Sequence, residues 1–376
     1  MKKLITVITL LSISCWVAAQ SLTQPPSGDN QKASVTQFIG PVSININYSS
    51  PDVTDGSGQD RKGRIWGELV PYGLNNLGFG TSTAAPWRGG ANENTTITFS
   101  NAVKINGKDL KAGTYGLHII VEKDKPWTFI FSNNSSSWGS FFYNDKEDAL
   151  RVEATPTDSE FTRYLTYGFD NREASSATAF IQWENKRASF TIEVPNINDI
   201  YLTAMRNELR GTTGFNYQNF MGAAQFCAQN KINLEEGLQW AEAAISAPFI
   251  GQEDFNTLQT KSNVLAVMGK EAEAEVVMNK AVKHPTASVS AIHQYGRTLL
   301  AAGKKEKAME IFRYNLKTHP EEKFTPNVGL ARAYTAMGDK KNAIKYWEVA
   351  IKNIPENQKG NTALYEAELK KLKEGK

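Results

Sequence analysis

VSAIHQYGRTLLAAGKKEKAMEIFRYNLKTHP, residues 289–320, is the stretch of sequence that decides the fold of the C-terminal half of the chain. It consists of two amphipathic runs whose apolar residues recur at the spacing of a helix, and Gly303 stands between the runs. The glycine ends the first helix because it adopts positive φ without strain, and Pro320 stops the second because proline cannot continue a helix. The stretch therefore predicts a hairpin of two helices.

The same hairpin recurs along residues 195–376. Prolines stand at 248, 285, 320 and 355, at spacings of 35 to 37 residues. Three successive segments contain a glycine, an alanine and a large apolar residue at fixed distances: Gly269, Ala274 and Met278; Gly303, Ala308 and Phe312; Gly338, Ala343 and Trp347. The alanine allows two helices to approach closely, and the large residue is expected to fill the gap to the next hairpin.

This pattern resembles the tetratricopeptide repeat, whose period is about 34 residues. The resemblance implies a solenoid of stacked helical hairpins. A first helix is expected at 198–209 and a capping helix at 361–373. The first hairpin, near 217–247, is atypical because Gly237 stands where alanine is usual, as is common in terminal repeats.

Residues 33–194 follow a period of two residues instead. Val42, Ile44, Ile46 and Tyr48 alternate with polar residues, as in a strand with one solvated face. Similar alternation follows at 115–121, 127–131, 150–154, 165–169, 179–183 and 190–194. Eight or nine short strands without an intervening helix predict an antiparallel β-sandwich or barrel.

Turn signals separate these strands. The Asn106-Gly107 pair predicts a tight hairpin turn, because both turn residues need positive φ. Residues 185–187 predict a loop between the last two strands, and the polar residues 21–32 predict a loose leader. The expected fold class is α+β in two separate domains, an antiparallel β-sandwich at 33–194 followed by an α-helical tetratricopeptide-like solenoid at 195–376.

The β-domain carries five motifs in order. They are RIWGELVPYG at 64–73, WRGGANENT at 87–95, AGTYGL at 112–117, WG at 138–139 and EDALRV at 147–152. This order resembles the bacterial family called domain of unknown function 2911, which is common in exported proteins. Two features depart from the family: residues 74–86 make a longer loop than its short form, and His118 stands where an apolar residue is usual. The family has no assigned activity, so the resemblance implies a fold and no chemistry.

The first residues predict export. Lys2 and Lys3 precede an uncharged apolar run, and small residues at 17–19 follow it, so a signal peptide is expected at 1–19 with cleavage before Gln20. The run is too short for a comfortable membrane span. Cys15 lacks the leucine usual three places before a lipidated cysteine, so a lipid anchor is not expected. The product is expected to be periplasmic or extracellular, without an integral membrane segment.

Composition narrows the classes of partner and site. The formal net charge of +3 gives no support to nucleic acid or an anionic membrane as partner. Beyond the leader Cys227 is the only cysteine, which excludes an intramolecular disulfide, and its apolar surroundings predict a buried structural thiol. The four histidines lack ligand spacing, so neither a metal site nor a cofactor is predicted.

The best candidates for a ligand site in the β-domain are Trp87, Arg88, Asn92 and Glu93. They occupy a glycine-rich loop between strands, where binding residues tend to lie. The structural alternative is that Trp87 plugs the end of the sandwich while Arg88 and Glu93 pair and cap backbone groups.

The repeats contain a second candidate site. Asn263, Arg297 and Arg332 fall on equivalent turns of successive hairpins, and Gln259 and His293 lie one turn earlier. Such a column would face a groove that takes an extended peptide or a partner's tail, because stacked arginines suit carboxylates. The alternative is that these residues are ordinary solvated side chains, or that the β-domain fills the groove.

No catalytic residue is predicted. The chain has no Gly-x-Ser-x-Gly motif, and its β-domain has no cysteine nucleophile. The expected function is an exported, non-enzymatic interaction protein that binds a protein or peptide through its helical repeats. The alternatives are binding of a small molecule or carbohydrate by the β-domain, and an unrecognised hydrolase.

Overall fold

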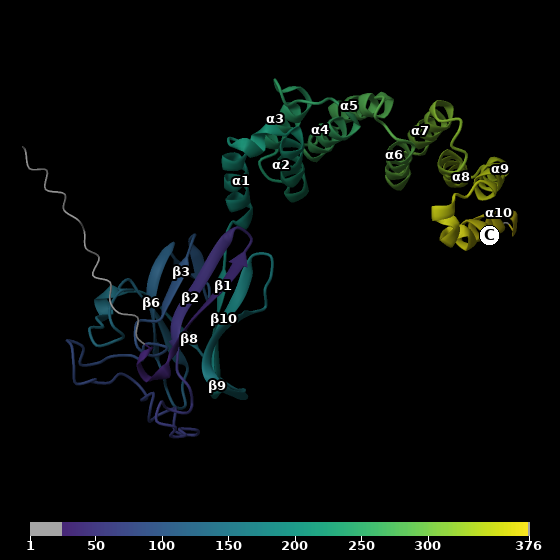
Figure 1. Cartoon of the computed structure of the whole chain (residues 1–376). Coiled ribbons are helices and arrows are strands. Elements are labelled where there is room, and N and C mark those ends of the chain that lie inside the picture. The colour runs from purple at the N-terminus through teal and green to yellow at the C-terminus, as the bar shows by residue number, and fades with distance from the viewer. Residues whose placement is uncertain (1–24, 375–376) are drawn as a thin grey trace, which may run out of the picture. The chain divides into compact units, whose positions relative to one another are not determined.

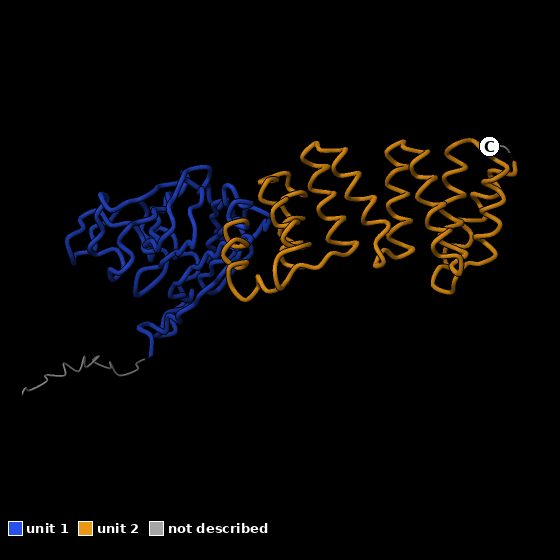
Figure 2. The backbone as a smooth tube through the Cα atoms, turned by 90° about the horizontal axis from the view of Figure 1, so that it is seen from above, with its two compact units in different colours: residues 1–201 blue, residues 202–376 orange. Residues whose placement is uncertain are grey.

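The computed structural model describes residues 25–374. The chain divides into two compact units, residues 1–201 and 202–376, which Figure 2 distinguishes by colour. The division falls inside the helix α1 (Ile197–Glu208), whereas the sequence places the domain boundary just before it, after Val194. The expected signal peptide, with Cys15 and the cleavage site before Gln20, lies outside the described residues.

The first unit is an antiparallel β-sandwich, as predicted. One sheet has six strands, in the order β1 (Gln31–Ile39), β2 (Val42–Ser50), β3 (Thr96–Phe99), β6 (Gly113–Ile120), β7 (Trp127–Ser132) and β8 (Asp148–Ala154). The other has four, in the order β5 (Lys108–Leu110), β4 (Val103–Ile105), β10 (Ser176–Glu193) and β9 (Thr157–Asp170). Figure 1 shows β1 and β2 as neighbours in the first sheet.

Alternation of side chains builds one core between these sheets. Ile44, Ile46 and Phe129 of the first sheet, and Ile181 and Trp183 of the second, are buried in a single hydrophobic cluster. The predicted Asn106-Gly107 turn joins β4 and β5, with φ of 46° and 78° at its two residues. Burial of the inward faces drives the assembly. Strand β2 alternates buried residues with more exposed ones, whereas β7 is buried along almost its whole length.

Two expectations about the strands are wrong. The loop predicted at 185–187 does not exist, because β10 runs without a break from Ser176 to Glu193. Glu184 adopts a φ of 51°, and the register of the pairing with β9 shifts there. The polar residues therefore form a β-bulge within the strand, and β10 continues beyond them. The leader expected at 21–32 also ends earlier, since β1 begins at Gln31. Pairing of β1 with β2 places the polar residues at the start of β1 in a strand, although their own secondary-structure propensity predicts a loop.

The second unit is a succession of antiparallel helical hairpins (Figure 1). Its helices after α1 are α2 (Tyr217–Asn230), α3 (Leu234–Ser246), α4 (Phe255–Val267), α5 (Glu271–Lys283), α6 (Val289–Ala301), α7 (Lys305–Thr318), α8 (Thr325–Met337), α9 (Lys340–Lys352) and α10 (Thr362–Glu374). Gly269, Gly303 and Gly338 follow the first helix of their hairpins with φ between 75° and 80°. The predicted hairpins and capping helix are therefore present.

Large residues fill the spaces between hairpins. Met278, Phe312 and Trp347 are at most 4% exposed, as the repeat pattern predicts. The ring of Phe312 lies against the backbone of both Gly296 in α6 and Gly329 in α8, where an added Cβ would collide with it. Replacing Phe312 or Trp347 by alanine is expected to cost about 3–5 kcal/mol.

The atypical first hairpin has a local explanation. Cys227 in α2 is fully buried, and a Cβ added to Gly237 in α3 would lie 2.7 Å from the Cβ of Cys227. Burial raises the pKa of the Cys227 thiol to about 11, so the group is a packed structural thiol, as predicted. The glycine in place of alanine therefore accommodates the larger thiol. In the described part of the chain, no helix is long and apolar enough to cross a membrane.

Candidate functional site

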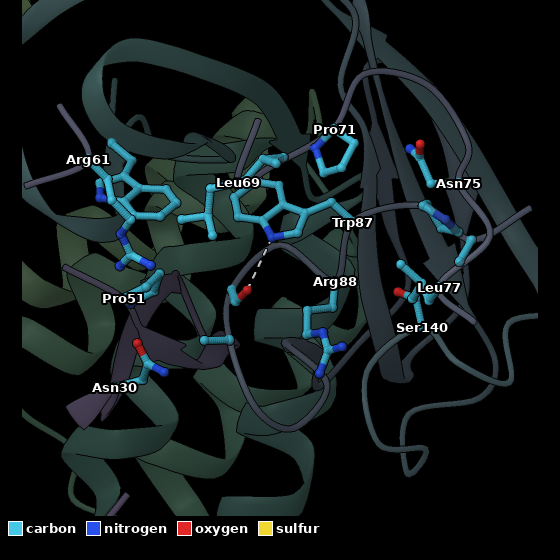
Figure 3. A pocket seen from close by; sticks show the side chains of 16 residues that line it. Asn30, Pro51, Arg61, Leu69, Pro71, Asn75, Leu77, Trp87, Arg88 and Ser140 are labelled. Carbon is cyan, nitrogen blue, oxygen red and sulfur yellow. Dashed lines mark hydrogen bonds between the residues drawn. The ribbon is translucent and has the colours of Figure 1, made fainter. Parts of the chain in front are cut away.

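A cavity of about 280 Å³ lies in the β-domain beside the predicted Trp87 loop. Most of its lining comes from the long connection between β2 and β3, and Asn30 ahead of β1, Ser140 and Trp183 of β10 complete it. Figure 3 shows Trp87 among the lining residues, with Arg88, Leu77 and Ser140 on one side of it and Arg61 on the other. Loops built on a rigid sandwich thus form the site, which is where binding residues concentrate.

Trp87 is fixed by its own backbone and by neighbouring rings. Its N–H donates to the carbonyl of Ile119 at 2.9 Å and its carbonyl accepts from the Ile119 N–H at 2.7 Å, so the loop is pinned to β6. The indole Nε1 donates to the carbonyl of Gly90 at 3.1 Å, the bond drawn in Figure 3. The ring stacks near Trp183, with centroids 6.3 Å apart and planes 17° apart. A rigid aromatic wall results.

Arg88 is a half-buried cation in the same lining. Its Nη1 donates to the carbonyl of Asn92, and its guanidinium lies 5.0 Å from the ring centroid of Phe141. Gly139 packs directly against the guanidinium, where an added Cβ would collide with it. Burial lowers the pKa of Arg88, and no ion pair to it is found among residues 25–374. The charge is therefore desolvated without a neutralising carboxylate.

The predicted pairing of Arg88 with Glu93 is wrong. Glu93 forms an ion pair of 2.8 Å with Lys32 and accepts a hydrogen bond from the Ser49 hydroxyl at 3.1 Å. It lies in a separate shallow hollow, away from the lining of the Trp87 cavity. Asn92 donates through Nδ2 to the carbonyl of Ser27, so its side chain is used to hold the chain ahead of β1. The four predicted residues are therefore split, with Trp87 and Arg88 at the cavity.

Sequence inspection missed the group that lies beside Arg88. His118 is 2% exposed, and its Nδ1 is 2.9 Å from the Oγ of Ser140, which lines the cavity. Burial, and next the positive charge of Arg88, lower the pKa of His118 from 6.5 to about 4, so the imidazole is neutral at pH 7. In the sequence, the feature that could have revealed this pair was the position of Ser140 directly after the Trp138-Gly139 motif.

The Ser140–His118 pair is a poor nucleophile and base. A general base works best when its pKa is near the operating pH, and a pKa of about 4 is far below neutrality. No carboxylate lines the cavity to serve as a second catalytic group. Among the described residues, no three His, Cys, Asp or Glu side chains are grouped to hold a metal ion.

In the repeats, three of the five predicted groove residues come together. Burial, and then the charges of Arg332 and Arg297, lower the pKa of His293 to about 4, while a hydrogen bond with the Thr325 backbone acts in the opposite direction. Burial and the charge of Arg297 also lower the pKa of Arg332. Groups on α6 and on α8 therefore lie within electrostatic reach of one another.

This cluster is not free of negative charge. Glu368, on the capping helix α10, and Tyr365 favour the charged form of Arg332, although the net effect of its surroundings is a lowered pKa. Glu368 is itself paired with Lys371 at 3.0 Å. Arg297 is exposed and Arg332 is half-buried, so a ligand can reach the pair from solvent.

The other two predicted groove residues lie elsewhere. Gln259 and Asn263 line a cleft of about 240 Å³ together with Gln294, Tyr295 and Thr298 of α6. None of His293, Arg297 and Arg332 is in that lining. Gln259 is half-buried and Asn263 is exposed. The predicted column therefore divides into an amide-lined cleft and a cationic cluster.

The geometry defines a two-part protein, a β-sandwich with a loop-lined cavity followed by a helical-repeat unit. Residues 30–192 match the model of the family described as "Protein of unknown function (DUF2911)", and residues 327–357 match the model of a tetratricopeptide repeat. Both matches, and their order along the chain, confirm the resemblance given by the sequence motifs.

Solved structures share weaker similarity. "Crystal structure of MamA" is 14% identical, with a TM-score of 0.31 over 43% of this chain and 89% of that one. YrrB, described as "a TPR protein with an unusual peptide-binding site", is 18% identical, with a TM-score of 0.31 over 46% and 86%. MamA 41-end from Desulfovibrio magneticus RS-1 is 16% identical, with a TM-score of 0.28 over 43% and 96%. Scores this low carry no argument about function. A search of curated proteins found none that matches the chain.

Proposed function

We propose that this chain is an exported, non-enzymatic interaction protein whose helical repeats bind a segment of a partner protein that carries carboxylates. The observation that carries the proposal is the cationic cluster, in which Arg297 lies close enough to Arg332 of the neighbouring hairpin for its charge to lower the pKa of Arg332. A tetratricopeptide repeat is a fold used in protein interactions, and the repeat match overlaps α8, where Arg332 lies.

The chemistry of the cluster favours an anionic ligand. Two guanidinium groups close together repel each other, and a carboxylate between them removes that repulsion while accepting charge-assisted hydrogen bonds. The neutral His293 adds no further positive charge at pH 7. Repeats extend such a contact along the stack, because equivalent positions recur in each hairpin.

The test compares wild type with the double variant Arg297→Ala/Arg332→Ala. The probe is an acetylated acidic peptide with a free C-terminal carboxylate, and its Gln- and Asn-containing amidated form is the neutral control. Since hydrogen bonds to charged groups contribute about 1.5–3 kcal/mol each, the double variant should weaken binding by more than about tenfold. Arg313→Ala, which removes one exposed arginine from the second helix of its hairpin, is the control for loss of a positive charge outside the cluster.

A second arm addresses natural partners. Pull-down from envelope extract is run with the intact chain and the double variant, and circular dichroism confirms that the variant is folded. Equal binding of acidic and neutral peptides to the wild type, with the same proteins captured by both baits, would overturn the proposal.

Export is tested separately from binding. The proposal expects the protein outside the cytoplasm with Gln20 as its first residue, because residues 1–19 have the charge and hydrophobicity pattern of a signal peptide. N-terminal sequencing of the protein recovered from the periplasm or medium decides the point. Recovery of the uncleaved chain in the cytoplasm, or a lipid on Cys15, would contradict it.

A further inference from the structure

The β-domain holds a second site that differs in kind from the cationic cluster of the repeats. We propose that the Trp87 cavity binds a small organic anion, whose carboxylate or similar oxyanion contacts Arg88 and Ser140 and whose apolar or aromatic body lies against Trp87 and Trp183. The two tryptophans line the same cavity as the arginine and the serine (Figure 3).

Charge is the first argument. The lining contains two cations, Arg61 and Arg88, and no acidic residue. Arg61 donates through Nη2 to the carbonyl of Asp52 at 2.9 Å, and Arg88 donates to the carbonyl of Asn92. A guanidinium has five N–H donors, so these bonds leave donors of Arg88 available. A half-buried charge without a counter-charge costs free energy, and an anion in the cavity offsets that cost.

The walls are the second argument. Apart from its few polar groups, the cavity is lined by tryptophan, leucine, valine, proline and alanine side chains: Trp87, Trp183, Leu69, Val70, Leu77, Pro51, Pro71, Pro86, Ala85 and Ala91. A mostly apolar lining with a few convergent polar groups is the usual composition of a small-molecule site. Inorganic phosphate or acetate would use the arginine and leave these walls unfilled.

Ser140 supplies the third argument. Its side chain is 1% exposed, and its Oγ lies 2.9 Å from Nδ1 of His118. When the neutral imidazole carries its hydrogen on Nδ1, it donates to Ser140, and the serine hydroxyl is free to donate to an oxyanion in the cavity. The pKa of about 4 keeps His118 neutral at pH 7, which makes this tautomer available. Arg88 and Ser140 then act on the ligand together.

The loop at 74–86 sets the size of the ligand. It contributes Asn75, Leu77, Ala85 and Pro86 to the lining, and the backbone of Ser82 donates to the carbonyl of Phe141 at 3.0 Å. The loop is therefore fastened to the segment that carries Ser140. A volume of about 280 Å³ corresponds to roughly nine water molecules, which suits an acid with one or two rings or a short chain.

The experiment measures binding of three aromatic carboxylates to the full chain: benzoate, phenylacetate and indole-3-acetate, each beside its neutral amide. Calorimetry gives the affinities, and for benzoate and phenylacetate tryptophan fluorescence also reports on the cavity, since Trp87 and Trp183 line it. At least one carboxylate should bind about tenfold more tightly than its amide, and Arg88→Met should remove that preference. Arg172→Met, which removes an exposed arginine outside the lining, should bind as wild type does.

Further variants keep the result decisive. Ser140→Ala should weaken carboxylate binding several-fold, and the Arg297→Ala/Arg332→Ala double variant should leave it unchanged, which separates this site from the peptide site. If Arg88→Met fails to fold, the comparison of acid with amide on wild type and on Arg88→Lys decides. The proposal is overturned if no carboxylate shows saturable binding, if acids and amides bind equally, or if a folded Arg88→Met binds like wild type.

Discussion

The two units contain the same pair of chemical groups in different settings. In the sandwich, burial and Arg88 hold His118 neutral, and in the repeats, burial, Arg332 and Arg297 hold His293 neutral. The cavity of the sandwich is bounded by loops and lined by two arginines, Arg61 and Arg88, whereas the repeats present arginines from successive hairpins. A loop-bounded cavity of about 280 Å³ suits a small anion, and charges repeated on successive hairpins suit an extended one. The architecture around the pair therefore determines the size of the ligand.

The largest expected effect tests whether the units are separate at all. Phe129→Ala in the sandwich and Phe312→Ala in the repeats each remove a fully buried ring, so each should cost about 3–5 kcal/mol of unfolding free energy. Each substitution should shift the unfolding transition of its own unit, measured by calorimetry and circular dichroism. The comparison fails if either substitution shifts both transitions equally.

Fragments 33–194 and 195–376, expressed alone, should also fold.

The next effect is a loss of stability in acid. The pKa values of His118 and His293 are depressed to about 4, while the unfolded chain titrates near 6.5. Between these values the unfolded state binds a proton that the folded state does not, so stability falls as pH drops from about 6.5 to 4. Each histidine should contribute a loss of up to about 3 kcal/mol.

The paired variants assign this acid sensitivity to the units. His118→Gln should flatten the pH dependence of the sandwich transition only, and His293→Gln that of the repeat transition only. Denaturant unfolding at pH 7 and pH 4.5 measures both. Unchanged pH dependence in a folded His118→Gln protein would show that other groups are responsible.

A smaller effect, the dependence of binding on salt concentration, distinguishes the half-buried charge of Arg88 from the exposed charge of Arg297. Added salt screens exposed charges more than buried ones. Binding of the acidic peptide to the repeats should therefore weaken several-fold more between low and high salt than binding of an aromatic carboxylate to the cavity. Titrations at matched ionic strengths give the two slopes. Equal slopes would mean that Arg88 is as solvated as Arg297.

The repeat unit could be predicted well because its signals are local. Glycine, alanine and a large apolar residue at fixed spacing describe one hairpin, and Phe312 packs where that spacing places it. In the β-domain, the alternation of residues predicted the strands but not where each strand begins and ends. Pairing with β9 carries β10 through residues 185–187, and only the partner strand reveals that Glu184 forms a bulge.

The sites were less predictable because distant loops build them. Arg88 and Glu93 are close in sequence, yet Lys32 takes the carboxylate once β1 pairs with β2. Ser140 and His118 are 22 residues apart and meet only after the loop that follows β7 folds back. In the repeats, a constant period placed Arg297 and Arg332 near each other, but it did not show that Gln259 and Asn263 line a different cleft.

The fastening of the 74–86 loop bears on how this protein changes through evolution. A side chain added at Gly80 would collide with the carbonyl of Phe141, so that point of the loop cannot vary freely. Leu77 and Asn75, by contrast, face the cavity without belonging to the buried cluster between the sheets. Substitutions at these two positions would therefore change the lining of the cavity one side chain at a time without disturbing the core between the sheets.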